Sequence, residues 1–143
     1  MEIIKTKFPE IKRDYLETLQ INIGYKCNQA CSHCHVDAGP NRTEMMSDRI
    51  INLIPKVIKA NNIKMLDITG GAPELHPKFK QLVREVRSMN VEVMDRCNLT
   101  ILTEPGHENL ASFLASNKVQ ITASLPCYLK DNVDKQRGKG VFE

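Results

Sequence analysis

The sequence predicts an α/β protein with a parallel sheet, because short β-branched apolar segments alternate with segments of helical spacing. Four strands are expected, at residues 19–25, 64–69, 91–98 and 119–125. Helical patterns separate them, and this alternation is typical of βαβ units. Right-handed crossovers would place the carboxyl ends of all the strands at one edge, where α/β proteins hold their functional residues.

Three helices are expected between these strands. Ser47 is a candidate N-cap for the first helix, and Pro55 should interrupt that helix. Pro77 suits the first position of the second helix. Beyond residue 125 we expect a loop until residues 141–143, which would open another helix. The predicted inward-facing residues of the three helices are Ile50, Ile51, Ile54, Val57 and Ile58, then Phe79, Leu82, Val83 and Val86, then Leu110, Phe113 and Leu114.

Composition indicates one globular domain in a reducing compartment. The 143 residues are 41% hydrophobic and 26% charged, which is ordinary for such a domain. With no Trp, three Tyr and four Phe, and without a basic stripe, the chain lacks the features of a nucleic-acid binder. No apolar run approaches the roughly 20 residues of a membrane span, and the charged N-terminus does not resemble a secretory signal. We therefore expect a cytoplasmic protein without membrane or nucleic-acid partners, whose cysteines are metal ligands rather than disulfides.

Conspicuous polar clusters follow each of the four predicted strands. They are CNQACSHCH at 27–35, GGAPE at 70–74, RCN at 96–98 and SLPCY at 124–128. If the sheet is parallel, the four clusters lie at the same edge and form one site.

The stretch CNQACSHCH admits several metal centres. Cys31, Cys34 and His35 form the pattern of c-type haem attachment, but that reading leaves Cys27 unexplained. Zinc would need a fourth ligand, which His33 or His35 could supply. Buried cysteines without any ligand are a further possibility, although the loop is polar. The spacing C-x₃-C-x₂-C uses all three thiols for a [4Fe–4S] cluster, with one iron left without a protein ligand.

Cys27, Cys31 and Cys34, followed by Gly70-Gly71 after the second strand, resemble the radical S-adenosylmethionine (radical SAM) family. The resemblance implies a partial (β/α) barrel, of which about four of the usual six βα units are present. It implies that the three cysteines hold a [4Fe–4S] cluster and that S-adenosylmethionine chelates the open iron. An electron from a donor such as flavodoxin or ferredoxin would then produce a 5′-deoxyadenosyl radical.

The same resemblance suggests further cofactor contacts. Gly70 and Gly71 would line the methionine moiety, since glycine lets the backbone approach a ligand closely. The family commonly has Gly-Gly-Glu-Pro here, whereas this chain has Ala72 in the acidic place, then Pro73 and Glu74. His33 also stands where an aromatic residue is common. The remaining positions similar to the family's contacts with the cofactor are Asn98, Ser124 and Arg137.

The sequence around these motifs gives a more specific resemblance. NIGYKCNQACSHCHVDAGPNRTEMM, LDITGGAPELHP, DRCNLTILTEPG and ASLPCYLKDNVDKQRGKGVFE together resemble the arsenosugar-biosynthesis radical SAM proteins. That resemblance implies adenosyl transfer to a methylated trivalent arsenic compound. Cys97 and Cys127 lie outside the cluster motif, at predicted strand ends, and soft thiolates suit trivalent arsenic. One or both are candidate substrate ligands; the alternative is that they pack as small apolar residues.

The predicted organisation is an N-terminal extension at residues 1–15 and the N-terminal part of a radical SAM core at 16–143. Because only four strands are expected, we expect a truncated core with an open edge at the fourth strand. Such a chain would bind the cluster but catalyse weakly. The alternative function is a catalytically inactive iron–sulfur or other metal-binding module.

Overall fold

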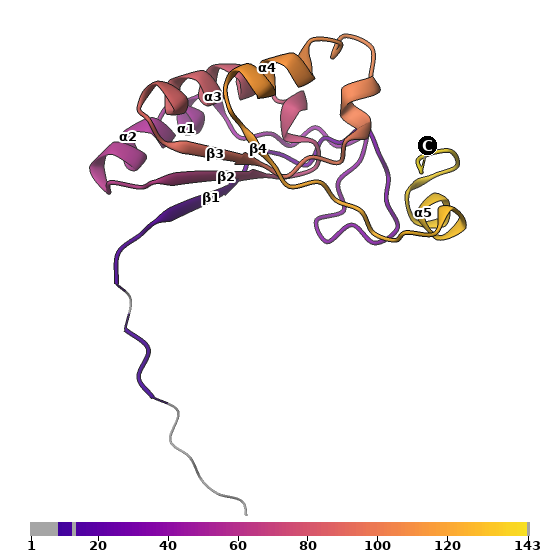
Figure 1. Ribbon diagram of the computed structural model, residues 1–143, viewed down its shortest axis with the longest axis horizontal. Coiled ribbons are helices and arrows are strands. Elements are labelled where there is room, and N and C mark those ends of the chain that lie inside the picture. Colours follow the sequence, from indigo (N-terminus) through magenta and orange to yellow (C-terminus); the bar gives the residue numbers. More distant parts are fainter. Residues whose placement is uncertain (1–8, 13, 143) are drawn as a thin grey trace, which may run out of the picture.

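The alternating apolar segments form one parallel sheet with the strands in sequential order, β1-β2-β3-β4 (Figure 1). The computed structural model describes residues 9–12 and 14–142. Its strands are β1 (Thr18–Asn22), β2 (Met65–Thr69), β3 (Glu92–Asp95) and β4 (Gln120–Ile121). The predicted α/β class and parallel sheet are confirmed. Within the described residues β4 pairs only with β3, so β4 is an edge of the sheet.

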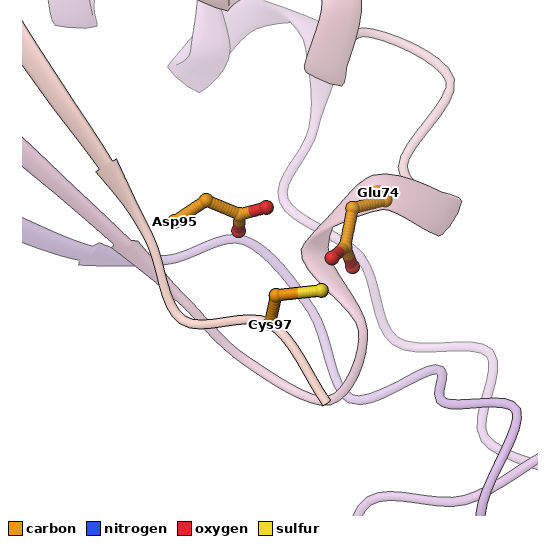
Figure 2. Close-up of side chains that lie close together, drawn as sticks. All are labelled: Glu74, Asp95 and Cys97. Carbon is orange, nitrogen blue, oxygen red and sulfur yellow. The ribbon is translucent and has the colours of Figure 1, made fainter. Parts of the chain in front are cut away.

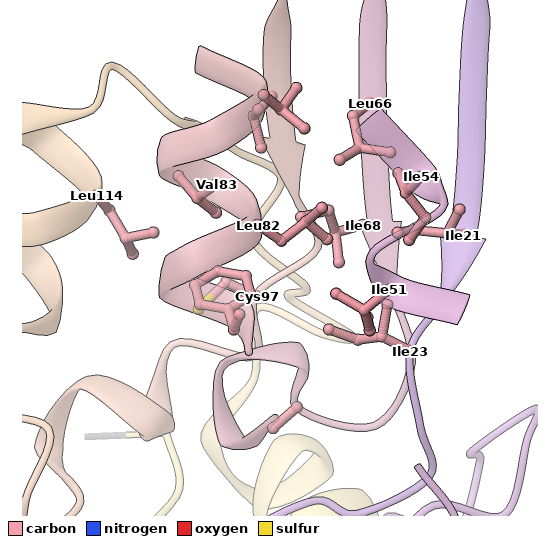
Figure 3. Close-up of a cluster of buried hydrophobic side chains, with 14 of the residues drawn as sticks. Ile21, Ile23, Ile51, Ile54, Leu66, Ile68, Leu82, Val83, Cys97 and Leu114 are labelled. Atoms are coloured by element: carbon pink, nitrogen blue, oxygen red, sulfur yellow. The ribbon is translucent and has the colours of Figure 1, made fainter. Parts of the chain in front are cut away.

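Helices α1 (Asp48–Ile51), α2 (Ile54–Ala60), α3 (Phe79–Ser88) and α4 (Leu110–Ser116) cover one face of the sheet (Figure 1). Their apolar side chains pack against those of β1, β2 and β3 to form the core (Figure 3). Two short 3₁₀ helices, η1 (Pro73–Leu75) and η2 (Thr100–Thr103), follow β2 and β3. None of the helices in the described part of the chain has both the length and the apolar character that crossing a bilayer requires.

Most of the predicted helical faces are confirmed. Residues 79, 82, 83 and 86 of α3 are buried, as are Leu110 and Leu114 of α4. Phe113 is half-buried, with the cationic groups of Lys80 and Arg84 over its ring. The helix expected here is interrupted between α1 and α2, just before Pro55, because proline donates no backbone hydrogen bond.

Three predictions of local structure are wrong, and a fourth is confirmed only in part. Ile50 and Val57 are exposed, because the break between α1 and α2 turns them out of the apolar face. Pro77 precedes α3 without joining it, since the turn after η1 extends to Lys78. The prediction for Ser47 is confirmed in position, since Ser47 is the N-cap of α1, but its side chain makes no capping hydrogen bond. The stretch expected to be a loop contains α5 (Lys130–Arg137), whose polar sequence buries only Val133.

The predicted N-terminal extension and the predicted last helix are only partly covered by the described residues. Most of the predicted extension at residues 1–15 lies outside the described residues, and the described part of it joins no helix or strand. Residues 139–142 form turns, and residue 143 of the predicted last helix lies outside the described residues.

The loops that follow the strands gather at the carboxyl edge of the sheet (Figure 1). The long loop between β1 and α1 carries the three clustered cysteines, and α5 lies beside it. The Ser32 N–H donates a hydrogen bond of 2.9 Å to the carbonyl of Gln136. Residues about a hundred positions apart in the chain therefore meet at one edge.

Candidate active site at the carboxyl edge

Backbone hydrogen bonds fix the shape of the cysteine loop. Cys27 donates its N–H to Gly39 (3.1 Å), and Gly39 donates its own to Tyr25 (3.1 Å). The loop is thereby closed at its base. Cys27 is buried, whereas Cys31 and Cys34 are half-buried and more accessible.

The sulfur atoms of this loop receive N–H donors. The Gln29 backbone N–H donates to Cys27 Sγ (3.4 Å), and the Ala38 N–H donates to Cys34 Sγ (3.2 Å). Asn98, which follows β3, donates its amide to Cys27 Sγ at 3.5 Å. Burial raises the pKa of the Cys27 and Cys31 thiols, and neighbouring thiolates raise it further. The Arg137 charge opposes this rise in pKa at Cys31. A bound cation would compensate the charge that burial and crowding otherwise disfavour.

The Gly70-Gly71 turn joins the cysteine loop backbone to backbone. The Gly71 N–H donates to the carbonyl of Gly24 (2.9 Å), and the Ala72 N–H donates to that of Lys26 (2.9 Å). A Cβ on Gly70, whose φ is +148°, would lie 2.5 Å from the Gly24 oxygen, and one on Gly71 would collide with the Lys26 carbonyl. Glycine is therefore required at both positions for this approach.

One cavity of about 640 Å³ opens among these loops. The three clustered cysteines, Gly70 and Gly71 line it, together with side chains that follow β3 and β4. Of the residues that the sequence nominated as ligands or cofactor contacts, the cavity is lined by Cys27, Cys31, His33, Cys34, His35, Gly70, Gly71, Asn98, Ser124 and Arg137.

This cysteine pattern on this fold is matched by a known family. The family model for the radical SAM superfamily matches residues 21–143. The chain belongs to the radical SAM superfamily. Membership implies a [4Fe–4S] cluster and S-adenosylmethionine as cofactors, and the residues fit them: three thiols with N–H donors to sulfur, beside a glycine-lined cavity.

Relatives of this radical SAM protein include two probable GTP 3′,8-cyclases. The one from Saccharolobus solfataricus is 27% identical over 129 residues, which are 90% of this chain and 41% of that protein. The one from Sulfurisphaera tokodaii is 29% identical over 77 residues, which are 54% of this chain and 25% of that protein. The chain thus spans less than half the length of these relatives. Their names give no support to the finer resemblance to arsenosugar-biosynthesis proteins, which stays a proposal.

Two solved structures share the fold. Streptococcus suis SuiB bound to S-adenosylmethionine matches with a TM-score of 0.71 and 15% identity, over 90% of this chain and 29% of that one. SuiB bound to its precursor peptide SuiA matches with a TM-score of 0.70 and 16% identity, over 87% and 28%. At these identities the likeness shows the fold alone, and it confirms the predicted partial barrel.

Several nominated residues lie away from this radical SAM cavity. Ala72, Pro73 and Glu74 are buried and do not line it. Cys97 is buried in the core beside Glu74. Cys127 is half-buried outside the lining, and its neighbour Pro126 lines the cavity. Leu129 N–H and the Asn132 amide donate to Cys127 Sγ (3.5 and 3.6 Å), and the Leu129 bond is the main reason that the pKa of Cys127 is lowered.

The cavity also contains residues that sequence reasoning did not nominate as ligands. Gln29, Arg96, Thr122 and Gln136 line it. Arg96 and Thr122 come directly after β3 and β4. Arg96 belongs to the RCN cluster that the sequence places at a strand end, whereas Thr122 lies inside the predicted strand at 119–125, which extends beyond the end of β4.

Proposed function

We propose that this chain, by itself or as part of a longer enzyme, cleaves S-adenosylmethionine reductively at a [4Fe–4S] cluster held by Cys27, Cys31 and Cys34. The observation that carries this proposal is the convergence of these three thiols with the Gly70-Gly71 turn on one cavity. Three thiolates leave one iron of such a cluster without a protein ligand, and an open position is the mark of a metal used for chemistry. When bound, the cluster and S-adenosylmethionine together supply the electron and the 5′-deoxyadenosyl radical.

Side chains from the segments that follow β3 and β4 are suited to hold the cofactor's polar groups. Arg137 lines the cavity, and its Nη2 donates to Ser124 Oγ at a distance of 2.6 Å. The Arg137 Nε is buried and has no hydrogen-bond partner among the described residues. A buried guanidinium donor without a partner favours a ligand carboxylate there. We assign Arg137 to the methionine carboxylate and Asn98 and Ser124 to the nucleoside.

For the substrate, we propose a methylated trivalent arsenic compound that receives the deoxyadenosyl group. The supporting feature is Cys127, a half-buried thiol of lowered pKa next to the cavity wall. A thiolate fraction that is higher than usual favours binding of a thiophilic centre. Cys97 is a weaker candidate, because its side chain is buried beneath the loops.

A guanine nucleotide is the second candidate substrate. The relatives named as probable GTP 3′,8-cyclases favour it. An inactive iron–sulfur module is the third possibility, and it differs from both enzymes in failing to cleave S-adenosylmethionine. We further propose that residues 16–143 are part of a radical SAM core whose electrons come from a flavodoxin or a ferredoxin.

The test of cleavage is anaerobic reconstitution of the chain with iron and sulfide, reduction with dithionite, and measurement of 5′-deoxyadenosine. We expect bound iron and sulfide and turnover of S-adenosylmethionine. Cys31→Ala is the control and should lose both. A chain that retains a full cluster but yields no 5′-deoxyadenosine would support the inactive module instead.

The two substrate candidates are separated by adding either a dimethylated trivalent arsenical or GTP to the reduced enzyme. The arsenic proposal expects an adenosylated arsenic product by mass spectrometry. It also expects loss of that product in Cys127→Ser, with 5′-deoxyadenosine formation retained. Consumption of GTP and no arsenic product would overturn it.

A further inference from the structure

Outside the cavity lining, two acidic side chains and a thiol converge at the ends of β2 and β3. They are Glu74 on η1, Asp95 at the last position of β3, and Cys97 two residues later. A ligand atom of each lies within 4.8 Å of the other two. Figure 2 shows the Asp95 and Glu74 carboxyl groups and the Cys97 sulfur pointing toward one another. All three are more than nine-tenths buried, and Asp95 is 0% exposed.

The two carboxyl groups lack the partners that buried polar groups normally have. None of their four oxygens has a hydrogen-bond partner among the described residues. Arg96, which follows Asp95 in the chain, is engaged elsewhere: it donates to the Asp67 carboxylate at 2.8–3.2 Å. Burying unpaired charge is costly, so such sites normally contain a counter-charge, a proton or a metal ion.

The pKa shifts of Asp95 and Cys97 are those expected where buried negative charge has no counter-charge. Burial, and then the charge of Glu74, raise the pKa of Asp95 well above its ordinary value. Burial and the same Glu74 charge also raise the pKa of the Cys97 thiol. A cation among these three groups would reverse both effects, because it favours the ionised form of each.

We propose that Glu74, Asp95 and Cys97 form a second metal site, which binds a divalent cation of zinc's type. Atoms no more than 4.8 Å apart share a point within about 2.8 Å of all three. Small side-chain rotations bring that point to zinc distances of about 2.0–2.3 Å. The donor set joins one soft thiolate to two hard carboxylates, which suits a borderline-soft ion better than magnesium or calcium.

Such an ion would join two loops that line the cavity. Glu74 follows Gly70-Gly71 after β2, and Cys97 precedes Asn98 after β3. An ion held by both segments fixes their separation from the buried side. The site is therefore expected to be structural, and its occupancy is independent of whether S-adenosylmethionine is cleaved.

The first test uses the full chain with its iron–sulfur cluster assembled, so that Cys27, Cys31 and Cys34 are occupied. The chain is given one equivalent of zinc, freed of excess ion, and measured by zinc-edge X-ray absorption. We expect one sulfur at about 2.3 Å together with oxygen ligands at about 2.0 Å. Cys97→Ser should remove the sulfur and Cys127→Ser should not. A sulfur signal that survives Cys97→Ser would overturn the proposal.

The second test is thermal unfolding of the same protein with and without zinc. The wild type should melt at a higher temperature with zinc, because binding to the folded state stabilises it. Glu74→Gln should weaken zinc binding at least about tenfold and abolish most of this rise. Asp131→Asn, an exposed acid on α5, is the matched control and should behave as wild type. If the two carboxyls instead share a proton, zinc will not raise the wild-type melting temperature, and the metal site is refuted.

Discussion

The two walls of the cavity are built in different ways. On the cluster wall, the cysteine loop and the Gly70-Gly71 turn exchange backbone hydrogen bonds, and Cys27 belongs to the hydrophobic core. On the opposite wall, residues 121–129 are mostly exposed, with Leu125 at 72% and Tyr128 at 82%. Across residues 9–12 and 14–142, its backbone hydrogen bonds to β3 and the segment after β3 are confined to Thr122 and Ser124, which bond to Asp95 and Cys97 at 2.9–3.2 Å.

This difference separates two kinds of constraint. The cysteine loop packs into the core and is therefore preorganised. Substitutions in this loop should reduce both the free energy of unfolding and the binding of the cluster. The exposed wall contributes reactive and adaptable groups whose substitution costs little stability. Mutations on the two walls should therefore separate stability from reactivity.

The largest expected contrast is between two thiols at the ends of neighbouring strands. Cys127 should react with iodoacetamide at least about a hundredfold faster than Cys97, because only the ionised, accessible thiol is nucleophilic. The pKa of Cys127 is lowered, whereas Cys97 is buried with a raised pKa. Peptide mapping by mass spectrometry measures both rates in one sample. In denaturant the two rates should become similar, and a native ratio near one would show that the walls do not differ in this way.

Next in size is the effect of a single methyl group on the cluster wall. Gly71→Ala should destabilise the fold by roughly 1–3 kcal/mol, because the new Cβ collides with the Lys26 carbonyl. Gly39→Ala, in the same loop, is the control: a Cβ there meets no atom within 4 Å. It should change stability by less than about 0.5 kcal/mol. Urea unfolding and iron content measure the two variants, and equal losses would contradict the proposed fit between the loops.

A smaller effect is expected at the amide that contacts Cys27. Asn98 donates to Cys27 Sγ and to Asn28 Oδ1 (2.9 Å). Asn98→Ala should cost about 1 kcal/mol and weaken cluster retention on the order of tenfold, as for other groups that orient metal ligands. Asn117→Ala removes a comparable bond, 2.8 Å to the Phe113 carbonyl, far along the chain. It should cost similar stability while leaving the iron content unchanged.

The sheet and its core could be predicted from the sequence because period and apolarity determine them locally. β2, β3 and β4 lie within the predicted ranges and β1 begins one residue before its range, and the buried stripe of α3 follows its spacing. The polar helix α5 was missed for the opposite reason. It buries only Val133 and is held by contacts with distant residues such as Ser32, which no local pattern reveals.

The part of the candidate site that is formed by sequence motifs could be predicted. The three cysteines and two glycines stand out by type and spacing, and the structure brings them to one cavity. Glu74 and Cys97 were nominated for this cavity and lie outside its lining, because η1 buries Glu74 and Cys97 packs in the hydrophobic core. The convergence of Glu74 with Asp95 depends on the register of β2 against β3, which spacing alone does not give.

The smallest effect concerns Asp67, which connects the sheet to the cavity wall. It accepts hydrogen bonds from Gln20 (2.7 Å) and Arg96 (2.8 Å), and the Arg96 guanidinium is the main reason that its pKa is lowered. A carboxyl whose pKa is lower in the folded state stabilises the protein above its ordinary pKa, and this stabilisation is lost as the pH falls through the folded value. Asp67→Asn should therefore cost on the order of 1 kcal/mol at neutral pH, with the difference from wild type shrinking in acid. Asp37→Asn, whose side chain is fully exposed beside Arg42, should differ little at either pH. Urea unfolding of the three proteins across this range measures the difference, and a gap for Asp67→Asn that does not change with pH would mean that the ion pair is not its source.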